Sequence, residues 1–232
     1  MVNMLNKFRE LNWLIYGSIF SSAISVLLLM LFPHFDISFS NLFYSYGEGF
    51  IYRNNFIVQF LFKSIPILTK SLFALVLLYL VYLVVISKVF NRKIINSILY
   101  VILSISVGPG LLVNHVFKEN SGRARPAQIK DFGGNKNFTS VFQYSKECLH
   151  NCSFSSGHAA MAYSLTSFAY IFPAFFSRIY CTALFFGSLV GLSRILMGGH
   201  FLSDIIASCC IVLTINHLLY LCLQKLKLTR IE

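Results

Sequence analysis

Six apolar stretches dominate this sequence, and each is close to the length of helix that crosses the hydrocarbon core of a bilayer. The stretches are Asn12–Phe32, Ser71–Val89, Ile94–Phe117, Ser156–Phe172, Ile179–Met197 and Phe201–Leu223. Only 12% of the 232 residues are charged, whereas soluble domains carry about 25%. The chain is therefore predicted to be an all-α, polytopic membrane protein with six transmembrane helices in a single domain from 1 to 232.

The segment from Pro33 to Lys63 separates the first two predicted spans. It mixes aromatic residues with Ser, Asn and Gly, and its apolar runs are too short to cross a bilayer. We expect an interfacial or re-entrant segment here.

The basic residues predict an orientation. One side of the expected bundle carries most of them, and the positive-inside rule makes that side, with both termini, cytoplasmic. They are Lys7, Arg9, Lys88, Arg92, Lys93, Arg178, Lys225, Lys227 and Arg230. The net charge of +11 suits anionic lipid headgroups rather than nucleic acid. No obligate protein partner is evident, and the expected location is a bacterial inner membrane.

The long polar loop from Lys118 to Cys152 is expected on the opposite, periplasmic side. It holds six basic and three acidic residues, a net charge of +3, which indicates that it binds an anion. Cys148 and Cys152 are close enough in sequence to form a small disulfide if the loop meets an oxidising compartment. The sequence leaves that pairing open.

The segment SRILMGGHFLSD places Arg194, His200 and Asp204 in otherwise apolar sequence. Because Asp204 follows His200 by four residues, the two would share one face of a helix. The carboxylate would then accept the Nδ1 proton and leave Nε2 free to attack. Polar groups at this depth are costly, so they indicate function; the alternative is a buried polar cluster that only holds helices together.

Two further stretches are expected on the same face. KENSGRARP supplies Lys118 and Arg125, whose cations suit a phosphate. SFSSGHAA supplies Ser156, Gly157 and His158 at a predicted helix start, where free backbone N–H groups favour an anion. Two histidines would then serve as acid and nucleophile on opposite sides of phosphorus.

Acidic residues are scarce, with only eight in the chain. A two-metal phosphatase needs several carboxylates around its ions. On the predicted outer face only Asp204 is well placed, with Glu119 and Asp131 as weaker candidates. Chemistry through a phosphohistidine, with no metal and no cofactor, therefore fits the residues better.

Together, the segments 118–126, 155–158 and 193–204 resemble the type 2 phosphatidic acid phosphatase superfamily. Its pattern is K-x6-RP, PSGH and SR-x5-H-x3-D, and all three parts occur here in order and at the family's spacing, with Ser155 in place of the family's proline. The resemblance implies a metal-independent phosphoric monoester hydrolase. It assigns nucleophilic attack to His200, orientation of that histidine to Asp204 and protonation of the leaving oxygen to His158. The implied phosphate ligands are Lys118, Arg125, Arg194, Ser156 and Gly157.

Arg123 is additional to this pattern. We expect it to contact either a second phosphate or sugar of the substrate, or the membrane surface.

The expected substrate is a lipid phosphate whose headgroup lies at the membrane surface. The loop sequences look most similar to the bacterial lipid A 1- or 4′-phosphatases. Phosphatidylglycerophosphate and undecaprenyl diphosphate phosphatases share the same catalytic pattern. A lipid phosphotransferase and a non-catalytic lipid-phosphate transporter are further alternatives, the transporter disfavoured because binding alone needs no nucleophile with an orienting carboxylate.

Overall fold

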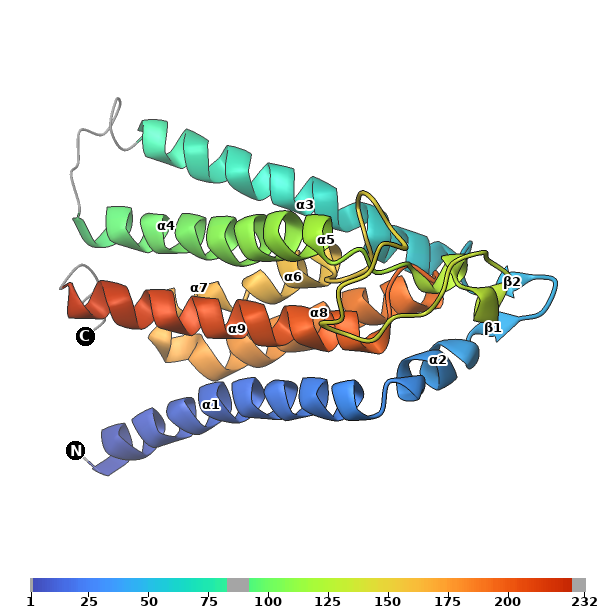
Figure 1. Cartoon of the computed structure of the whole chain (residues 1–232). Coiled ribbons are helices and arrows are strands. Elements are labelled where there is room, and N and C mark those ends of the chain that lie inside the picture. Colours follow the sequence, from blue (N-terminus) through green and yellow to red (C-terminus); the bar gives the residue numbers. More distant parts are fainter. Residues whose placement is uncertain (1, 83–91, 227–232) are drawn as a thin grey trace.

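The computed structural model describes residues 2–82 and 92–226, with the side chains of 2–11, 77 and 80 left out of the account. Long helices run side by side, and the loops gather at one end of the bundle (Figure 1). In the described part of the chain, five helices are long and apolar enough to cross a membrane. The predicted all-α membrane fold is confirmed, although the count of six spanning helices is not.

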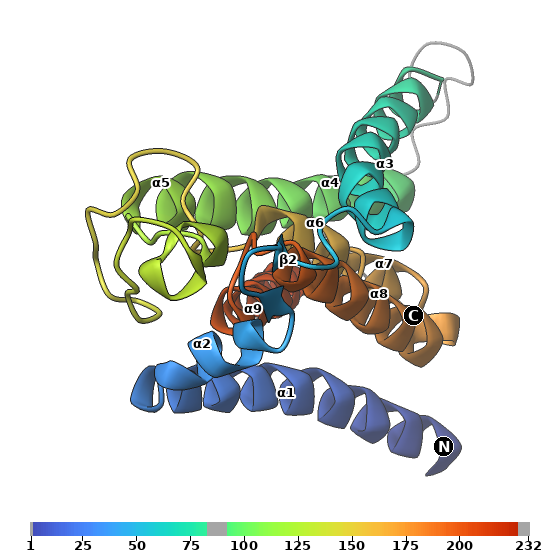
Figure 2. The same cartoon turned by 90° about the vertical axis from the view of Figure 1, so that its right-hand side faces the viewer.

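Helix α9 (Leu202–Lys225) contacts most of the bundle. It packs against α1 (Val2–Leu31), α4 (Arg92–Ile105) and α8 (Phe176–Leu196), and both cartoons show it among these helices (Figures 1 and 2). One core cluster contains the buried side chains of Tyr100, Tyr170, Tyr180 and Leu213. The N-terminus of α9 is thereby held at the loop end of the molecule.

Helix α3 (Phe56–Val81) begins well before the predicted start at Ser71, so that prediction was wrong. Asn55 caps the helix, because its side chain accepts hydrogen bonds from the backbone N–H groups of Ile57 (3.0 Å) and Val58 (3.4 Å). The predicted end at Val89 lies outside the described residues. The earlier start places the first turns of α3 beside the loop end.

The segment between α1 and α3 is short and structured. It contains α2 (His34–Asn41) and a two-stranded antiparallel hairpin, β1 (Tyr44–Ser45) and β2 (Gly49–Phe50). This agrees with a segment whose apolar runs are too short to span. The hairpin lies at the loop end of the bundle (Figure 1).

The third predicted span, Ile94–Phe117, contains Gly108-Pro109-Gly110 and stays helical through these residues. It continues from α4 through a π-helical segment, η2 (Ser106–Phe117), into α5 (Lys118–Asn120). The carbonyl of Pro109 accepts a hydrogen bond from Nδ2 of Asn114 at 2.8 Å. The wider π turn therefore accommodates a proline that cannot donate, without ending the helix.

The fourth predicted span, 156–172, consists of two short helices, α6 (Gly157–Ser164) and α7 (Ser167–Ile171). The chain turns at Thr166, whose hydroxyl donates to the carbonyl of Tyr163 (2.7 Å) and accepts from Asn216 (2.9 Å). A threonine hydroxyl bonded to the backbone offers an alternative to a regular helix. Because of this turn, the segment does not form one long helix.

An irregular loop connects α5 to α6 and contains two short 3-10 turns, η3 (Pro126–Gln128) and η4 (Lys130–Phe132). A third short turn, η5 (Pro173–Phe175), precedes α8. The loop, the hairpin and the α8–α9 turn share one end of the bundle, opposite the start of α1 and the end of α9 (Figure 1).

Candidate active site

The three motif segments meet at this loop end. Lys118 begins α5, His158 lies in the first turn of α6, Arg194 lies in the last turn of α8, and His200 stands between α8 and α9. The charges of Lys118, Arg125 and Arg194 are close enough to act on His158. The structure therefore brings together residues that are up to 82 positions apart in sequence (from Lys118 to His200).

His200 is 1% exposed and has a defined tautomer. Its Nδ1 lies 2.7 Å from the backbone carbonyl oxygen of Ser153. A carbonyl only accepts, so Nδ1 carries the proton and Nε2 keeps its lone pair. Burial, together with the positive charges of Arg194 and Arg125, lowers the pKa of His200 to about 4 against the opposing effect of Asp204. The imidazole is thus neutral at neutral pH, as a nucleophile requires.

Asp204 does not contact His200 in the way the sequence predicted. His200 precedes α9, so the two do not share a helix face, and Oδ2 of Asp204 lies 3.6 Å from Nδ1 of His200. The direct acceptor is the carbonyl of Ser153. Asp204 acts on the imidazole through its charge and through Ser153, whose hydroxyl donates to Oδ2 at 2.6 Å.

The position of Asp204 follows from the start of α9. Its Oδ2 accepts the backbone N–H of Phe201 at 2.8 Å, which satisfies a donor that the helix leaves free. Its Oδ1 accepts from Nη1 of Arg123 at 2.6 Å. Asp204 is completely buried, and each of its oxygens has at least one donor.

Arg123, the additional arginine of the loop, is bound by buried carboxylates of the protein. It is 1% exposed, and its guanidinium binds Asp36 (2.8 Å) and Asp204 (2.6 Å). It also donates to the hydroxyl of Ser203 (2.8 Å) and to the carbonyl of Thr139 (2.9 Å). A buried arginine needs such partners, and two carboxylates supply them.

Asp36 and Ser153 were missed by sequence reasoning. Asp36 comes from α2, and Ser153 precedes the motif that contains His158. A signal for Asp36 did exist, because it is one of only eight acidic residues and lies among aromatic residues. Ser153 carried no signal, since the atom that binds His200 is a backbone carbonyl.

The other side of the site holds buried polar atoms that lack a hydrogen-bond partner among the described residues. Within the described residues, Nε2 of His158, Nε of Arg194 and Oγ of Ser156 are buried atoms without a hydrogen-bond partner. Buried polar atoms are nearly always bonded. These three therefore indicate a site built for a polar ligand.

Phe62 of α3 links His158 and Arg194. The ring of His158 stacks on Phe62 with centroids 4.8 Å apart, and Cζ of Arg194 lies 4.3 Å from the Phe62 centroid. Sequence reasoning missed Phe62 because it lies ahead of the predicted start of α3. The phenyl ring packs against both polar side chains and leaves their N–H groups and nitrogen lone pairs available for a ligand.

Gly157 and Ser156 form the start of α6. A Cβ at position 157 would collide with the side-chain oxygen of Asn114, so a larger residue there would force Asn114 to move from its hydrogen bond with Pro109. The backbone N–H of Ser156 donates to Ser208 at 2.9 Å. The hydroxyl of Ser156, rather than its N–H group, is therefore the atom left for a ligand.

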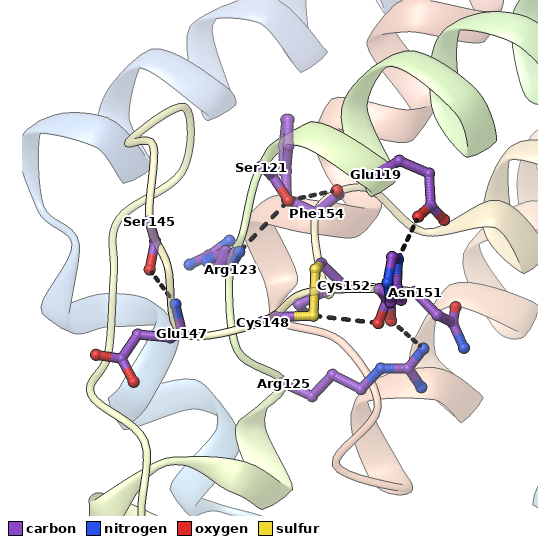
Figure 3. Close-up of a disulfide and its surroundings, with 12 residues drawn as sticks. Glu119, Ser121, Arg123, Arg125, Ser145, Glu147, Cys148, Asn151, Cys152 and Phe154 are labelled. Atoms are coloured by element: carbon purple, nitrogen blue, oxygen red, sulfur yellow. Dashed lines mark hydrogen bonds and ion pairs between the residues drawn. A yellow bond between two sulfur atoms is a disulfide. The ribbon is translucent and has the colours of Figure 1, made fainter.

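Cys148 and Cys152 are joined in a disulfide, with Cα atoms 5.6 Å apart. The enclosed turn includes Asn151, whose carbonyl accepts from Nη2 of Arg125 at 2.8 Å (Figure 3). The next residue after the disulfide is Ser153, the partner of His200. The disulfide turn and the residue after it therefore contact both Arg125 and His200.

In the part of the chain that the structure describes, no group of three or more His, Cys, Asp or Glu side chains could hold a metal ion.

The model of the PAP2 superfamily matches residues 97–228, more than half of the chain. This chain belongs to the PAP2 superfamily. That confirms the family predicted from the three motifs and its class of reaction, phosphoric monoester hydrolysis.

Three relatives carry the name lipid A 4′-phosphatase. The protein of Francisella tularensis subsp. novicida is 33% identical over 180 residues, which cover 76% of this chain and 81% of that protein. The protein of Rhizobium leguminosarum is 31% identical over 75% of this chain and 81% of its own length. The protein of Rhizobium etli is 30% identical over 75% of this chain and 73% of its own length.

A solved structure shares the fold. It is the transmembrane PAP2-type phosphatidylglycerolphosphate phosphatase from Bacillus subtilis, with a TM-score of 0.59 and 22% identity. The match covers 93% of this chain and 99% of the other.

Proposed function

We propose that this protein removes the 4′-phosphate of lipid A at the periplasmic face of a bacterial inner membrane. The chemistry is supported by one arrangement above all. His200 is buried and neutral, with Nε2 free, and it lies near Lys118, Arg125 and Arg194. The 4′ position comes from the names of the three relatives, and it refines the prediction of a 1- or 4′-phosphatase.

In the proposed reaction, Nε2 of His200 attacks phosphorus while the bond from phosphorus to the sugar oxygen breaks. With the phosphate anion bound beside it, His158 takes up a proton and gives it to the leaving oxygen, which departs as a hydroxyl. Water then attacks the phosphohistidine, His158 takes the water proton, and the N–P bond breaks to release inorganic phosphate. Phosphate-monoester hydrolysis is among the slowest uncatalysed reactions, so preplaced cations supply most of the acceleration.

The periplasmic orientation rests on charge and on the disulfide. Arg92, Lys93 and Lys225 lie at or beside the ends of helices away from the site, where the positive-inside rule expects cytoplasm. The disulfide of the loop belongs to an oxidising compartment. A lipid headgroup would meet the site from the outer leaflet.

Phosphate release by purified protein in detergent with EDTA tests this proposal. We expect release from lipid A, but not from phosphatidylglycerophosphate, phosphatidic acid or undecaprenyl diphosphate. His200→Ala abolishes it, and His115→Ala is the matched control, because His115 is an exposed histidine outside the site. Equal release from all four lipids would discard the substrate but keep the mechanism. Release only with added metal would contradict the mechanism, and labelled phosphate moving to a second lipid would indicate a transferase.

A further inference from the structure

A buried ionic network ties α2 to the active site. Asp36 of α2 is completely buried, and its Oδ2 lies 2.8 Å from Nη2 of Arg123. It also accepts from Ser203, both from the hydroxyl and from the backbone N–H at 2.9 Å. The other arm of Arg123 binds Asp204 at 2.6 Å. Asp36 and Asp204 thus share one arginine.

The hydrogen bonds indicate that Asp36 is ionised. Burial raises the pKa of Asp36, and the charge of Arg123 and the hydroxyl of Ser203 oppose that rise. The guanidinium of Arg123 and the hydroxyl and N–H groups of Ser203 all donate to its carboxylate. An ionised carboxylate only accepts, so this surrounding favours the charged form.

The charges of the network do not cancel. Two carboxylates and one guanidinium leave a net charge of −1 within hydrogen-bonding reach of Ser153, the partner of His200. Without Asp36, Arg123 would pair with Asp204 alone and the net charge would be zero. His200 gains positive charge as it attacks phosphorus, so the remaining negative charge stabilises that state.

Resting on the proposed function, we propose that Asp36 is a positioning residue for catalysis. It acts through Arg123, holding the guanidinium that orients Asp204 and sharing its charge so that Asp204 stays effectively negative towards His200. Asp36 lies outside all three motif segments. Helix α2 is therefore part of the catalytic machinery rather than a connection between α1 and the hairpin.

The test compares kcat and KM for Asp36→Asn, Asp36→Glu and the double variant Asp36→Asn/Arg123→Gln. In Asp36→Asn we expect kcat to fall about tenfold, the size of a typical coupling between buried charges. KM stays within about twofold, because Lys118, Arg125 and Arg194 are unchanged. Asp36→Glu retains the charge and recovers part of kcat.

The double variant separates charge from structure. It removes one carboxylate and the guanidinium. Asp204 is then the one charged group left in the network, and the net charge is −1, as in the parent. We expect its kcat to exceed that of Asp36→Asn by about threefold or more. A purely structural role predicts the opposite, since two buried contacts are lost instead of one. A double variant no faster than Asp36→Asn would overturn the proposal.

Ser40→Ala is the matched control. Ser40 lies one turn further along α2, is equally buried, and its hydroxyl has no hydrogen-bond partner in the described part of the chain, so kcat should not change. If Asp36→Asn does not fold, the double variant is compared with the parent. A kcat within about 30-fold of the parent supports the proposal, and a larger loss overturns it. Hydrolysis that survives in His200→Ala would instead refute the proposed function.

Discussion

The two sides of the site differ in how their polar atoms are bonded. On the Asp204 side, Asp36, Arg123, Ser153 and Ser203 bind one another and Asp204 through hydrogen bonds or ion pairs. On the phosphate side, described atoms of Ser156, His158 and Arg194 are buried without partners. A saturated network resists movement, whereas unpartnered donors are held ready for a ligand. One side is therefore built to fix the nucleophile, and the other to receive the phosphate.

A substitution that disrupts the hydrogen-bond network on the Asp204 side should have the largest effect. In Asp204→Asn, the side-chain NH₂ group faces either Nη1 of Arg123 or the two donors of Ser153 and Phe201, and the negative charge beside His200 is lost. We expect kcat to fall about 10³-fold or more, by analogy with the loss of an orienting aspartate. Stability should also fall by about 3 kcal/mol, because a buried pair loses one partner.

Steady-state kinetics and thermal unfolding of purified Asp204→Asn measure both effects. Cys210→Ser, at a half-buried free cysteine further along the same helix, is the control and should leave kcat within about tenfold. An Asp204→Asn variant that unfolds like the parent would contradict the saturated network.

A change on the phosphate side should reduce catalysis without lowering the stability of the fold. Arg194→Lys keeps the charge but loses the planar group that stacks on Phe62 and can bind phosphate with two N–H groups. We expect kcat/KM to fall about 100-fold, with KM rising. The free energy of unfolding should change by less than about 1 kcal/mol, because Nε of Arg194 has no hydrogen-bond partner among the described residues and Nη1 donates to a weak sulfur acceptor, Sδ of Met197.

Inhibition by inorganic phosphate checks the same claim. The parent should bind phosphate more tightly than Arg194→Lys, and Arg178→Lys, a cation at the opposite end of α8, should match the parent. If Arg194→Lys destabilised the protein as much as Asp204→Asn, Arg194 would contribute to the fold in the way the Asp204 side does, which would contradict this prediction.

The disulfide turn joins the two sides, so opening it should have an intermediate effect on both. Asn151 holds Arg125, and Ser153 holds His200. In Cys148→Ser/Cys152→Ser we expect kcat/KM to fall about threefold to tenfold, because a looser turn positions both groups less well. Activity of the parent should fall equally with dithiothreitol, and Cys181→Ser, an exposed free cysteine, should be unaffected. Unchanged activity after reduction would contradict the bridging role.

The smallest expected effect concerns stability against pH. Because burial lowers the pKa of His200 to about 4, whereas an unfolded histidine titrates near about 6.5, the unfolded chain binds more protons between these values. The contribution of His200 to stability is therefore full above about pH 6.5 and is lost as pH falls towards about 4. Melting curves should show the parent losing stability relative to His200→Gln over this range. Parallel curves would contradict a neutral, buried His200.

Sequence predicted the phosphate side better than the Asp204 side. Lys118, His158 and Arg194 were named from the spacing of short motifs, and the structure brings them together. Asp36 and Arg123 lie 87 residues apart, so their pairing depends on how α2 packs beside the loop. No local pattern specifies that packing.

The fold shows the same division. Apolar runs predicted most of the long helices, because hydropathy is a local property. The start of α3 depends on the capping by Asn55, and the turn in 156–172 depends on Thr166 bonding to Asn216 of a distant helix. Both are decided by particular hydrogen bonds rather than by average hydropathy.

Trapping the phosphorylated enzyme tests the central claim most directly. Protein mixed with ³²P-labelled lipid A is quenched in alkali within milliseconds, and the labelled peptide is identified. We expect label on His200, stable to alkali and labile to acid, absent in His200→Ala and retained in His115→Ala. Turnover without any labelled protein, or label on a residue other than His200, would contradict the account.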